Sequence, residues 1–509
     1  MNISRRWFIG GASAFGALGA FGGNRFMKLP GFVPSGEPEL KFGVISDIHI
    51  KAYSNAGKKI ATGSLNLTFK STLEWFRDQK VDAVVIAGDM ADNSLIEELQ
   101  FVADAWESVF PGGKAPDGRK VEKVFVYGNH DEAGNNFATR YYPDKTERAK
   151  YALLADYGGW WERIFGEPYS TVYSKNIKGY TFIGTHWDRG DWRPGGNRTD
   201  PFGLIGPYLA EHGEKIDPSK PFFYIQHPHL KDTCYGPWAW GHDNGDATRA
   251  LMAYPNAIAI SGHSHYSLTD ERSVWQGAFT SVGAASLWYV ASPNDALAPS
   301  GYENTYGSGS VAWREDAAKM MPRFNPWGCR QGMLWSIYHD CIVMKRREFQ
   351  CGLDVGDDWV LPLPVAESKP FAFAERAKTI GVPEFAADAK LTITRIRAKN
   401  RGGKSRKGDA SIVAEEKDAL RIEIPRIPPI NGRRVMDFEV AAEAADGTSL
   451  IKHVLHEGFH EPIGRRRAES VAECVFAVAE LPKKCVRVKV TPRNCFGACG
   501  KALVAPMEV

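Results

Sequence analysis

Five short polar motifs, each placed after a short apolar run, constrain this chain more than any other feature. The apolar runs cover residues 42–46, 83–87, 124–127, 222–225 and 257–260. The motifs that follow them are Asp47-Ile48-His49, Gly88-Asp89 with Asp92, Gly128-Asn129-His130-Asp131, His227, and Gly262-His263-Ser264-His265. Short apolar runs between polar residues are typical of strands that are buried on both faces. In open α/β sheets ligands bind beyond the carboxyl ends of such strands, so we expect the five motifs to converge on one site.

The residue types and their spacing favour metal binding at that site. Asp47 and His49 lie two residues apart, so both side chains point the same way on an extended segment, and the last motif repeats this spacing. Asp89 offers two carboxylate oxygens, which suits a bridge between two cations, and Asn129 offers a neutral carbonyl oxygen. Imidazole, carboxylate and amide ligands without a thiolate fit Mn, Fe, Zn or Co. The sequence therefore predicts a site for two such ions.

The order D-x-H, G-D-x-x-D, G-N-H-D, H and G-H-x-H resembles the calcineurin-like metallophosphoesterase superfamily, over roughly residues 40 to 350. The resemblance implies an α/β fold with four layers, α-β-β-α. It also implies a phosphatase or phosphodiesterase in which a hydroxide that bridges two metal ions attacks phosphorus. Purple acid phosphatases carry a tyrosine three residues after the bridging aspartate, and Asp92 holds that position here. We therefore expect a different branch of the superfamily.

The same resemblance implies a role for each polar residue of the motifs. The first ion would be held by Asp47, His49 and His265, the second by Asn129, His227 and His263, and both by a bridging Asp89. His130 would stabilise the transition state or act as the general acid. Asp92 and Asp131 would orient ligands from outside the metal site.

Two further histidines are candidates for substrate contact. His229 lies two residues after His227, and His186 follows the strand-like run 180–184. Both therefore fall at strand ends, where a ligand would bind. The alternative is a structural role for each, which is the commoner fate of a single histidine.

The N-terminus predicts export. Residues 4–9, SRRWFI, resemble a twin-arginine signal, and a stretch rich in glycine and alanine follows to about Phe21. That stretch is too short and too rich in glycine for a stable membrane span. We expect the twin-arginine translocation machinery as a partner and a periplasmic or extracellular location. The alternative is a basic tail without a targeting role.

An exported protein can oxidise its cysteines, and this chain has eight. Cys474 with Cys485 and Cys495 with Cys499 are possible local pairs. Four cysteines allow three pairings, which sequence cannot choose between, and a zinc knuckle is the alternative.

We divide the chain into four segments. An export signal and linker cover 1–36, the metallophosphoesterase domain 37–351, a linker rich in Asp and Pro 352–369, and a C-terminal module 370–509. Apolar and polar residues alternate over 391–396, 420–424, 438–440 and 485–490, which predicts an all-β sandwich. The module resembles fibronectin type III or immunoglobulin-like domains. A role as spacer or packing partner is the expectation, and carbohydrate or surface binding is the alternative.

Charge and loop composition bear on the substrate. The chain has 63 basic and 60 acidic residues, so its charge offers no argument for binding nucleic acid. Tryptophans in the segments between the motif strands could stack a sugar or a nucleobase, or could only pack the loops. We expect an exported enzyme that hydrolyses a small-molecule phosphomonoester or phosphodiester. The alternative is a catalytically silent surface protein that binds carbohydrate through its C-terminal module.

Overall fold

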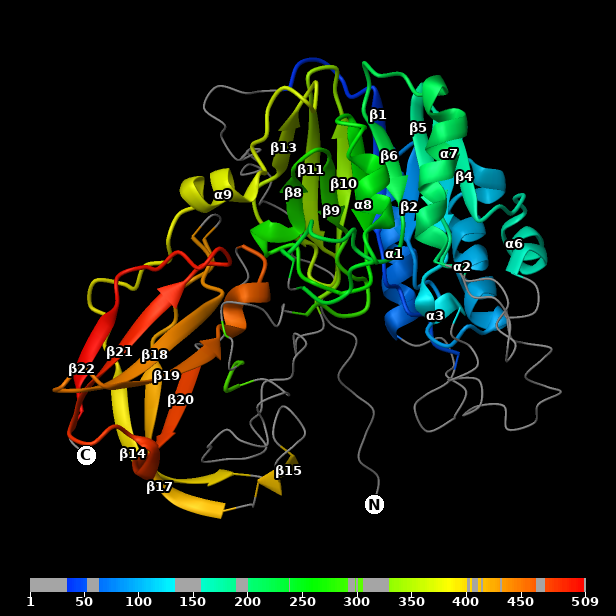
Figure 1. The fold of residues 1–509 in the computed structure, drawn as a ribbon. Coiled ribbons are helices and arrows are strands. Elements are labelled where there is room, and N and C mark those ends of the chain that lie inside the picture. The colour runs from blue at the N-terminus through cyan, green and yellow to red at the C-terminus, as the bar shows by residue number, and fades with distance from the viewer. Residues whose placement is uncertain are drawn as a thin grey trace, which may run out of the picture.

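Figure 1 shows the computed structural model of the chain. The described residues are 34–52, 64–132, 157–188, 200–237, 239–291, 298, 301–304, 329–400, 403–404, 411–412, 415–430, 433–463 and 472–507. The expected export signal at residues 4–9 lies outside them. None of the helices within these ranges is long and apolar enough to cross a membrane.

The first sheet of the N-terminal part has seven strands in the order β12-β11-β10-β1-β2-β3, and β13 also pairs with β11. The strands are β1 (Leu40–Ile45), β2 (Ala83–Ala87), β3 (Glu122–Val126), β10 (Gln331–Ile337), β11 (Cys341–Glu348), β12 (Leu353–Asp354) and β13 (Trp359–Pro362). β1, β2 and β3 run parallel, so their carboxyl ends lie at one edge of the sheet. β10 runs antiparallel to β1 and begins the outer half of the sheet.

The second sheet has six strands in the order β4-β5-β6-β7-β9-β8. The strands are β4 (Val172–Ile177), β5 (Tyr180–Thr185), β6 (Phe222–Ile225), β7 (Ala257–Ser261), β8 (Val274–Gln276) and β9 (Thr280–Gly283). β5, β6, β7 and β9 are parallel neighbours. β6 and β7 are buried along their whole length, as the apolar runs predict.

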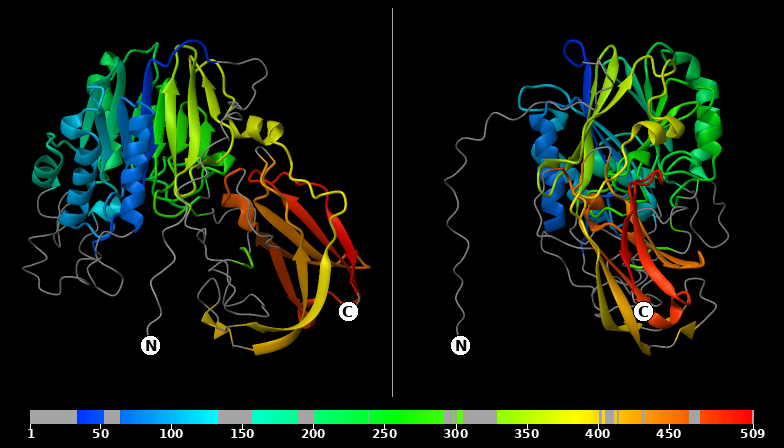
Figure 2. Two further views of the ribbon diagram at one scale, coloured as in Figure 1. Left: turned by 180° about the vertical axis from the view of Figure 1, so that it is seen from behind. Right: turned by 90° about the vertical axis from the view of Figure 1, so that its left-hand side faces the viewer.

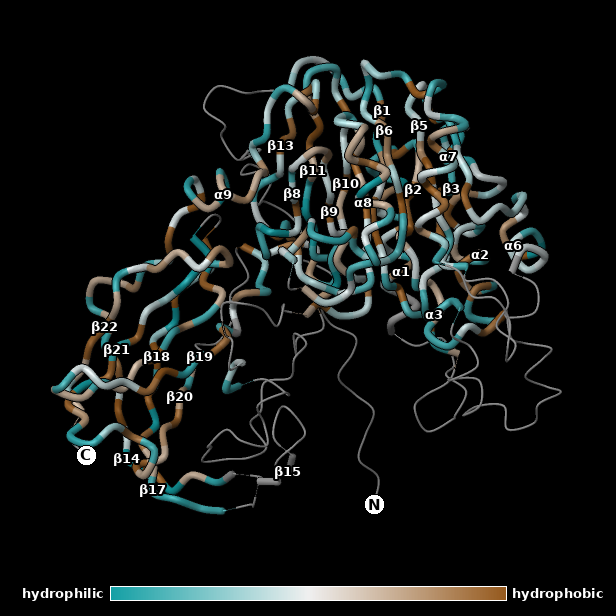
Figure 3. The backbone as a smooth tube through the Cα atoms, viewed as in Figure 1, coloured by the Kyte–Doolittle hydropathy of each residue, from teal (hydrophilic) through white to brown (hydrophobic). Residues whose placement is uncertain are grey.

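Aromatic side chains fill the space between the two sheets. Phe42 of β1 meets Phe182, Phe223 and Trp335, with ring centroids 5.2, 4.9 and 5.3 Å away. The contacts to the two phenylalanines are edge-to-face, an arrangement that aromatic rings prefer. These four residues are fully buried and belong to one core cluster that spans both sheets. Figure 3 shows the corresponding concentration of hydrophobic residues along the strands.

Helices cover the two outer faces of the sheet pair (Figure 2). On the first sheet lie α1 (Ser64–Asp78), α2 (Ile96–Val109) and α6 (Tyr157–Phe165), and on the second lie α7 (Ile205–His212) and α8 (Asp246–Leu251). A single turn, α3 (Asn129–Glu132), follows β3. The predicted four-layer α-β-β-α fold is confirmed.

The C-terminal module is all-β, as predicted, and its strands run from yellow through orange to red in Figure 1. One sheet contains β14 (Thr392–Asn400), β17 (Glu415–Ile424) and β20 (Ala472–Ala477). The other contains β18 (Asp437–Ala444), β19 (Ser449–Leu455), β21 (Cys485–Arg493) and β22 (Leu503–Pro506), and a short pair is formed by β15 (Gly403–Lys404) and β16 (Ser411–Ile412). Side chains of both larger sheets share one core cluster, which makes the module a sandwich.

The segment predicted as a linker, 352–369, is not a free connection. β12 and β13 fall within it and both pair with β11, which adds them to the first sheet. Phe371, just beyond it, is fully buried in the core between the sheets. The content of Asp and Pro predicts a linker. The apolar sequence Trp359-Val360-Leu361 instead pairs with residues 342–344 of β11 and covers part of the edge of the first sheet. Only after α9 (Phe373–Thr379) does the chain reach the strands of the C-terminal module.

The predicted cysteine pairs also need correction. All eight cysteines lie in described residues, and no disulfide joins any two of them. Cys474 lies on β20 and Cys485 on β21, which belong to different sheets of the sandwich. Both side chains are buried in the core of the module, so they serve as small apolar residues there.

A buried carboxylate, that of Glu271, joins the sheets of the N-terminal part to the segment that follows them. Glu271 accepts hydrogen bonds from Arg346 Nη1 on β11 at 2.9 Å and from Trp359 Nε1 on β13 at 2.7 Å. It also pairs with Arg376 of α9. All four residues are buried, so the two guanidinium groups depend on this carboxylate for charge compensation.

Direct hydrogen bonds connect the C-terminal module to the N-terminal part. Arg434 Nη2 donates to the carbonyl oxygen of Val355 at 2.9 Å. The Asn304 side chain donates to Leu455 O and accepts from Leu455 N, both at 2.9 Å. Arg434, Asn304 and Leu455 are buried, so this contact is a packed interface and not a loose tether.

We predict that Glu271→Leu lowers the free energy of unfolding by about 3–5 kcal/mol, because it removes the buried carboxylate with which both Arg346 and Arg376 pair. Guanidinium denaturation measures this change. Glu375→Gln on the exposed side of α9 is the control, because its pair with Lys378 lies at the surface and should contribute less than about 1 kcal/mol. Equal stability of the two variants would contradict the role of Glu271.

The same residue predicts an acid dependence. Burial acts to raise the pKa of Glu271, but Arg346 and Arg376 outweigh it and hold the pKa at about 2, below the ordinary 4.5. Because the pKa is lower in the folded protein, the stabilisation is complete above pH 4.5 and is lost as the pH falls toward 2. Glu271→Leu should therefore lose less stability than the unmodified protein across that window.

Candidate metal centre

The structure brings the seven predicted ligands together at the carboxyl ends of five strands. Asp47 and His49 follow β1, Asp89 follows β2, Asn129 follows β3, His227 follows β6, and His263 and His265 follow β7. The first three strands belong to one sheet and the last two to the other. The site therefore lies where the two sheets of the sandwich meet.

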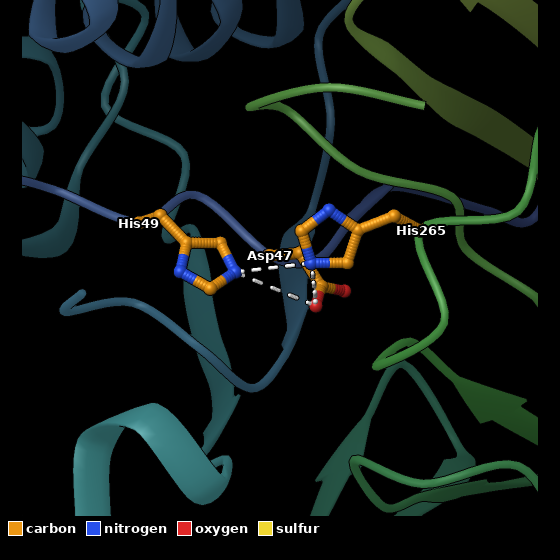
Figure 4. Close-up of side chains that lie close together, drawn as sticks. All are labelled: Asp47, His49 and His265. Carbon is orange, nitrogen blue, oxygen red and sulfur yellow. Dashed lines mark hydrogen bonds and ion pairs between the residues drawn. The ribbon is translucent and has the colours of Figure 1, made fainter. Parts of the chain in front are cut away.

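The first group contains Asp47, His49 and His265, which point toward one another in Figure 4. Asp47 Oδ1 lies 3.0 Å from His265 Nε2 and 3.8 Å from His49 Nε2. The two Nε2 atoms are 3.1 Å apart. Asp47 Oδ2 accepts a hydrogen bond from the backbone N–H of His263, which leaves Oδ1 to face the group. Three buried side chains thus present one ligand atom each to a common point.

The second group is centred on His227. Its Nε2 atom lies 3.1 Å from Asn129 Oδ1, 3.2 Å from His263 Nδ1 and 3.1 Å from Asp89 Oδ2. The side-chain oxygen of Asn129 faces the group, which is the atom that a cation would need. His227 and Asp89 are almost completely buried.

Asp89 stands between the two groups. Its Oδ2 atom is 3.6 Å from His49 Nε2 and 3.1 Å from His227 Nε2. Its other oxygen, Oδ1, accepts a hydrogen bond from the backbone N–H of His130 at 2.8 Å. One carboxylate oxygen therefore faces both groups while the second holds the carboxylate in place.

Backbone carbonyl groups set the tautomers of two ligand imidazoles. His227 Nδ1 donates to Ala87 O at 2.7 Å, and His265 Nδ1 donates to Tyr289 O at 3.2 Å. A carbonyl oxygen can only accept, so the hydrogen of each neutral ring sits on Nδ1. The Nε2 lone pair of each ring then points into the site, as a metal ligand requires.

Asp92 and Asp131 support the ligands from outside. Asp92 Oδ1 lies 3.0 Å from His49 Nδ1, and Lys51 Nζ lies 3.3 Å from Asp92 Oδ2. Asp131 accepts hydrogen bonds from the backbone N–H groups of Ala91 at 2.7 Å and Gly128 at 2.7 Å. Asp92 therefore orients an imidazole, while Asp131 joins the loops that carry Asp89 and Asn129.

The arrangement of donors and acceptors fits cations and little else. His49 Nε2 and His265 Nε2 face one another, and His227 Nε2 faces Asn129 Oδ1 and Asp89 Oδ2. His49 Nδ1 faces a carboxylate oxygen of Asp92, which accepts, so a neutral His49 ring also carries its hydrogen on Nδ1. When all three rings are neutral, the facing atoms are lone-pair atoms, which repel unless a positive charge lies between them. Two divalent metal ions, one in each group, would supply that charge.

Nearby carboxylates raise the pKa values of two of the ligand imidazoles, those of His49 and His227. Burial acts to lower the pKa of His49, but Asp47 and Asp92 outweigh it and raise the pKa to about 10. Burial also acts to lower the pKa of His227, but Asp89 raises it to about 9. The pKa of Asp47 lies well below its ordinary value: burial opposes this shift, and His265 and His49 overcome it. Asp47 and Asp89 are therefore charged, whereas burial lowers the pKa of His265 and, together with His227, lowers that of His263 to about 3, so among the ligand imidazoles cationic character is confined to His49 and His227.

Left-handed backbone is concentrated in the ligand residues. The φ angles are positive at Asp47 (52°), His49 (49°), Asp89 (51°), His263 (71°) and His265 (57°). For a residue other than glycine such a conformation costs on the order of 1–3 kcal/mol, and it persists only where surrounding structure enforces it. Here it turns each side chain back toward a common centre at the end of its strand. Sequence reasoning missed this feature, because no residue type marks it.

The glycines of the motifs serve close approach. A Cβ atom on Gly262 would overlap the side chains of Ser46 and Asp47. One on Gly88, whose φ is 92°, would overlap the His227 ring. These positions let backbone from one sheet contact ligands from the other.

The structure corrects the predictions for His186 and His229. His186 Nδ1 accepts a hydrogen bond from Tyr127 N at 3.0 Å, and the ring packs against Trp161 and Tyr169. Burial lowers the pKa of His186 to about 3, so the ring is neutral. Both His186 and His229 are buried, and neither lines the cavity at the metal groups.

His229 has a structural role instead. Its two ring nitrogens bond the hydroxyl groups of Ser261 at 2.8 Å and Ser264 at 2.6 Å. These serines flank Gly262 and His263 in the ligand turn after β7. His229 therefore holds the shape of that turn.

A cavity of about 290 Å³ opens above the two groups. Its floor contains ligand residues and His130, and its wall is largely aromatic. The lining residues are His49, Asp89, Asn129, His130, Trp240, His263, Ser264, His265, Tyr266, Trp288, Tyr289 and Ala291. Tyr289 was not expected from the sequence, although it directly follows one of the loop tryptophans.

One known protein family matches the part of the chain that contains this site. Residues 40–267 match the family described as calcineurin-like phosphoesterase. The matched span begins with the first residue of β1 and ends two residues after His265, so it contains all seven ligand residues. It supports a calcineurin-like metallophosphoesterase domain in the N-terminal part of the chain. No curated protein matches the chain.

Solved structures resemble the chain only weakly. A dimetal phosphatase from Danio rerio is 11% identical, with a TM-score of 0.36, and the match covers 64% of this chain and 99% of that protein. A purple acid phosphatase from yellow lupin (Lupinus luteus) seeds is 13% identical, with a TM-score of 0.33, and the match covers 65% of this chain and 56% of that one. The assignment of the fold therefore rests on the strand pairing described above.

We predict that Asp89→Ala releases metal from both groups, because Oδ2 faces each of them. Elemental analysis after reconstitution with Mn, Fe, Zn or Co should fall from two ions per chain to less than one. Asp104→Ala, which removes an exposed carboxylate of α2, is the matched control and should keep both ions. Full metal content in Asp89→Ala would show that this residue is not the bridge.

Proposed function

We propose, on the premise that residues 40–267 match the calcineurin-like phosphoesterases, that this protein is a dinuclear metal-dependent phosphoester hydrolase. The observation that carries the proposal is the facing of lone-pair atoms in two adjacent groups joined by Asp89 Oδ2. Such an arrangement suits two cations that together clamp an in-line displacement at phosphorus.

When bound, two such ions supply Lewis acidity to a phosphoryl oxygen and a nucleophile at neutral pH. The chain supplies the geometry. His49, His227 and His265 present Nε2 from rings that are fixed by Asp92, Ala87 and Tyr289. Because second partners hold these rings, little rearrangement is needed when the ions bind.

His130 is the residue that we assign to proton transfer. It lines the cavity and its ring lies edge-to-face on His49, with centroids 4.6 Å apart. Its Nδ1 donates to Asp92 O at 2.9 Å, so Nε2 is the ring atom that can carry a proton to a substrate. We propose that it protonates or stabilises the leaving oxygen.

We also propose that the enzyme is exported by the twin-arginine route to the periplasm or beyond. The support is the SRRWFI sequence at residues 4–9. The C-terminal module is proposed as a packing partner of the catalytic part, in keeping with the hydrogen bonds of Arg434 and Asn304.

The test of function is a panel of phosphomonoesters and phosphodiesters, assayed with protein whose metal content has been measured. Turnover that rises with occupancy up to two ions per chain would support the proposal. Protein that holds two ions yet hydrolyses no member of the panel would favour a silent binding protein.

We predict that His130→Ala keeps both ions and lowers kcat by roughly 10²–10⁴-fold, the usual contribution of a general acid. Elemental analysis and steady-state kinetics on the same preparation measure the two effects. His339→Ala, at an exposed position between β10 and β11, is the control and should leave both unchanged. Loss of metal from His130→Ala would show that His130 is a metal ligand and not the general acid.

A further inference from the structure

Trp240 is exposed at the mouth of the metal cavity although it is large and apolar. Its indole lies over the His263 ring with centroids 4.6 Å apart and an angle of 25° between the planes. One face of the indole is therefore occupied by a ligand residue. The side chain is nonetheless 58% exposed, so the opposite face meets solvent. An indole left uncovered in this way forgoes most of the stabilisation that burial would provide.

The other aromatic side chains of the wall are already occupied. The Trp288 ring contacts His49 with centroids 4.6 Å apart, and Lys51 Nζ lies 3.9 Å from the Trp288 ring centroid. The Tyr289 ring lies 4.2 Å from that of His265. Both are half-buried, so they shape the wall without offering a wide open face.

The wall is rigidly tied to the metal site. Ser286 Oγ accepts hydrogen bonds from the backbone N–H groups of Trp288 at 2.9 Å and Tyr289 at 3.3 Å. The same hydroxyl donates to Asp47 O at 3.1 Å. This part of the wall is therefore fixed relative to the first metal group.

We propose that Trp240 is a stacking platform that recognises a flat aromatic ring in the organic part of the substrate. This inference rests on the proposed function, since the phosphate would lie on the metal floor. The substrate class is then a phosphoester of a nucleoside or of an aryl alcohol. Stacking on an indole needs only a π-face, so it selects rings without reading one particular base.

The cavity disfavours the other substrate classes. Among the described lining residues the apolar side chains are aromatic rings and Ala291 around a cavity of about 290 Å³, and they form no long aliphatic channel that would suit a lipid chain. A sugar would need polar side chains for its hydroxyl groups. The carboxylate and amide side chains among the described lining residues are those of Asp89 and Asn129, and both face the metal groups. An aromatic group of the substrate could stack on the exposed face of the Trp240 indole.

The test compares substrates that differ only in the ring. Adenosine 5′-monophosphate is paired with ribose 5-phosphate, and the methyl esters of both form a second, diester pair. We expect the metal-loaded protein to prefer the adenine-bearing member of the pair that it hydrolyses. Trp240→Leu should lower kcat/KM for that member about 10-fold more than for the ring-free member, mainly through KM. Trp240→Phe should retain part of the preference.

A binding measurement makes the result independent of turnover. Adenosine has no phosphate to lose, and saturation-transfer NMR should detect its purine protons on the unmodified protein and not on Trp240→Leu. Trp160→Leu on α6 is the control, because that indole stacks with Arg163 away from the cavity. It should keep both the adenosine signal and the substrate preference.

The outcomes separate this inference from the proposed function. Equal hydrolysis of ring-bearing and ring-free members would overturn the platform and leave the phosphoesterase intact. Equal loss on both members of a pair, together with loss of metal, would show that Trp240 supports His263 and not the substrate. If no ester is hydrolysed, the proposed function fails, and the adenosine signal alone then decides whether Trp240 binds rings.

Discussion

The facing of lone-pair atoms from two different sheets is the constraint on which the rest of this structure depends. Asp47 and Asp89 come from one sheet and His227 and His265 from the other, and their ligand atoms lie 3.0–3.1 Å apart across the junction. Neutral imidazoles whose lone pairs face carboxylate oxygens would not stay so close. Positive charge must therefore be part of the folded state, whether as protons on imidazoles or as metal ions.

Much of this site could be predicted from the sequence because each ligand has a local signature. Asp47, Asp89 and His263 stand within three residues of a buried apolar run, and parallel strands bring such positions to one edge. The four layers are implied by the family resemblance, and strands buried on both faces agree with helices outside them. The all-β character of the C-terminal module could likewise be predicted from alternation alone.

Other features depend on contacts that only the folded chain reveals. The spacing predicts that His229 lines the cavity, yet Ser261 and Ser264, more than 30 residues later, bond both of its ring nitrogens. The composition predicts a linker after β11, yet the apolar residues of this segment pair with the edge of the first sheet. The left-handed backbone of the ligands is a third example, because tertiary packing enforces it against local preference. In each case contacts with residues distant in the sequence determine the local structure.

The division of the ligands between two sheets has a consequence for how the protein assembles. Each metal group takes residues from both sheets, so neither half of the sandwich can form a complete group alone. The centre therefore exists only after the aromatic layer around Phe42 has closed. Ions bound there would be held by residues of both sheets at once, so removing them would weaken the contact between the two sheets.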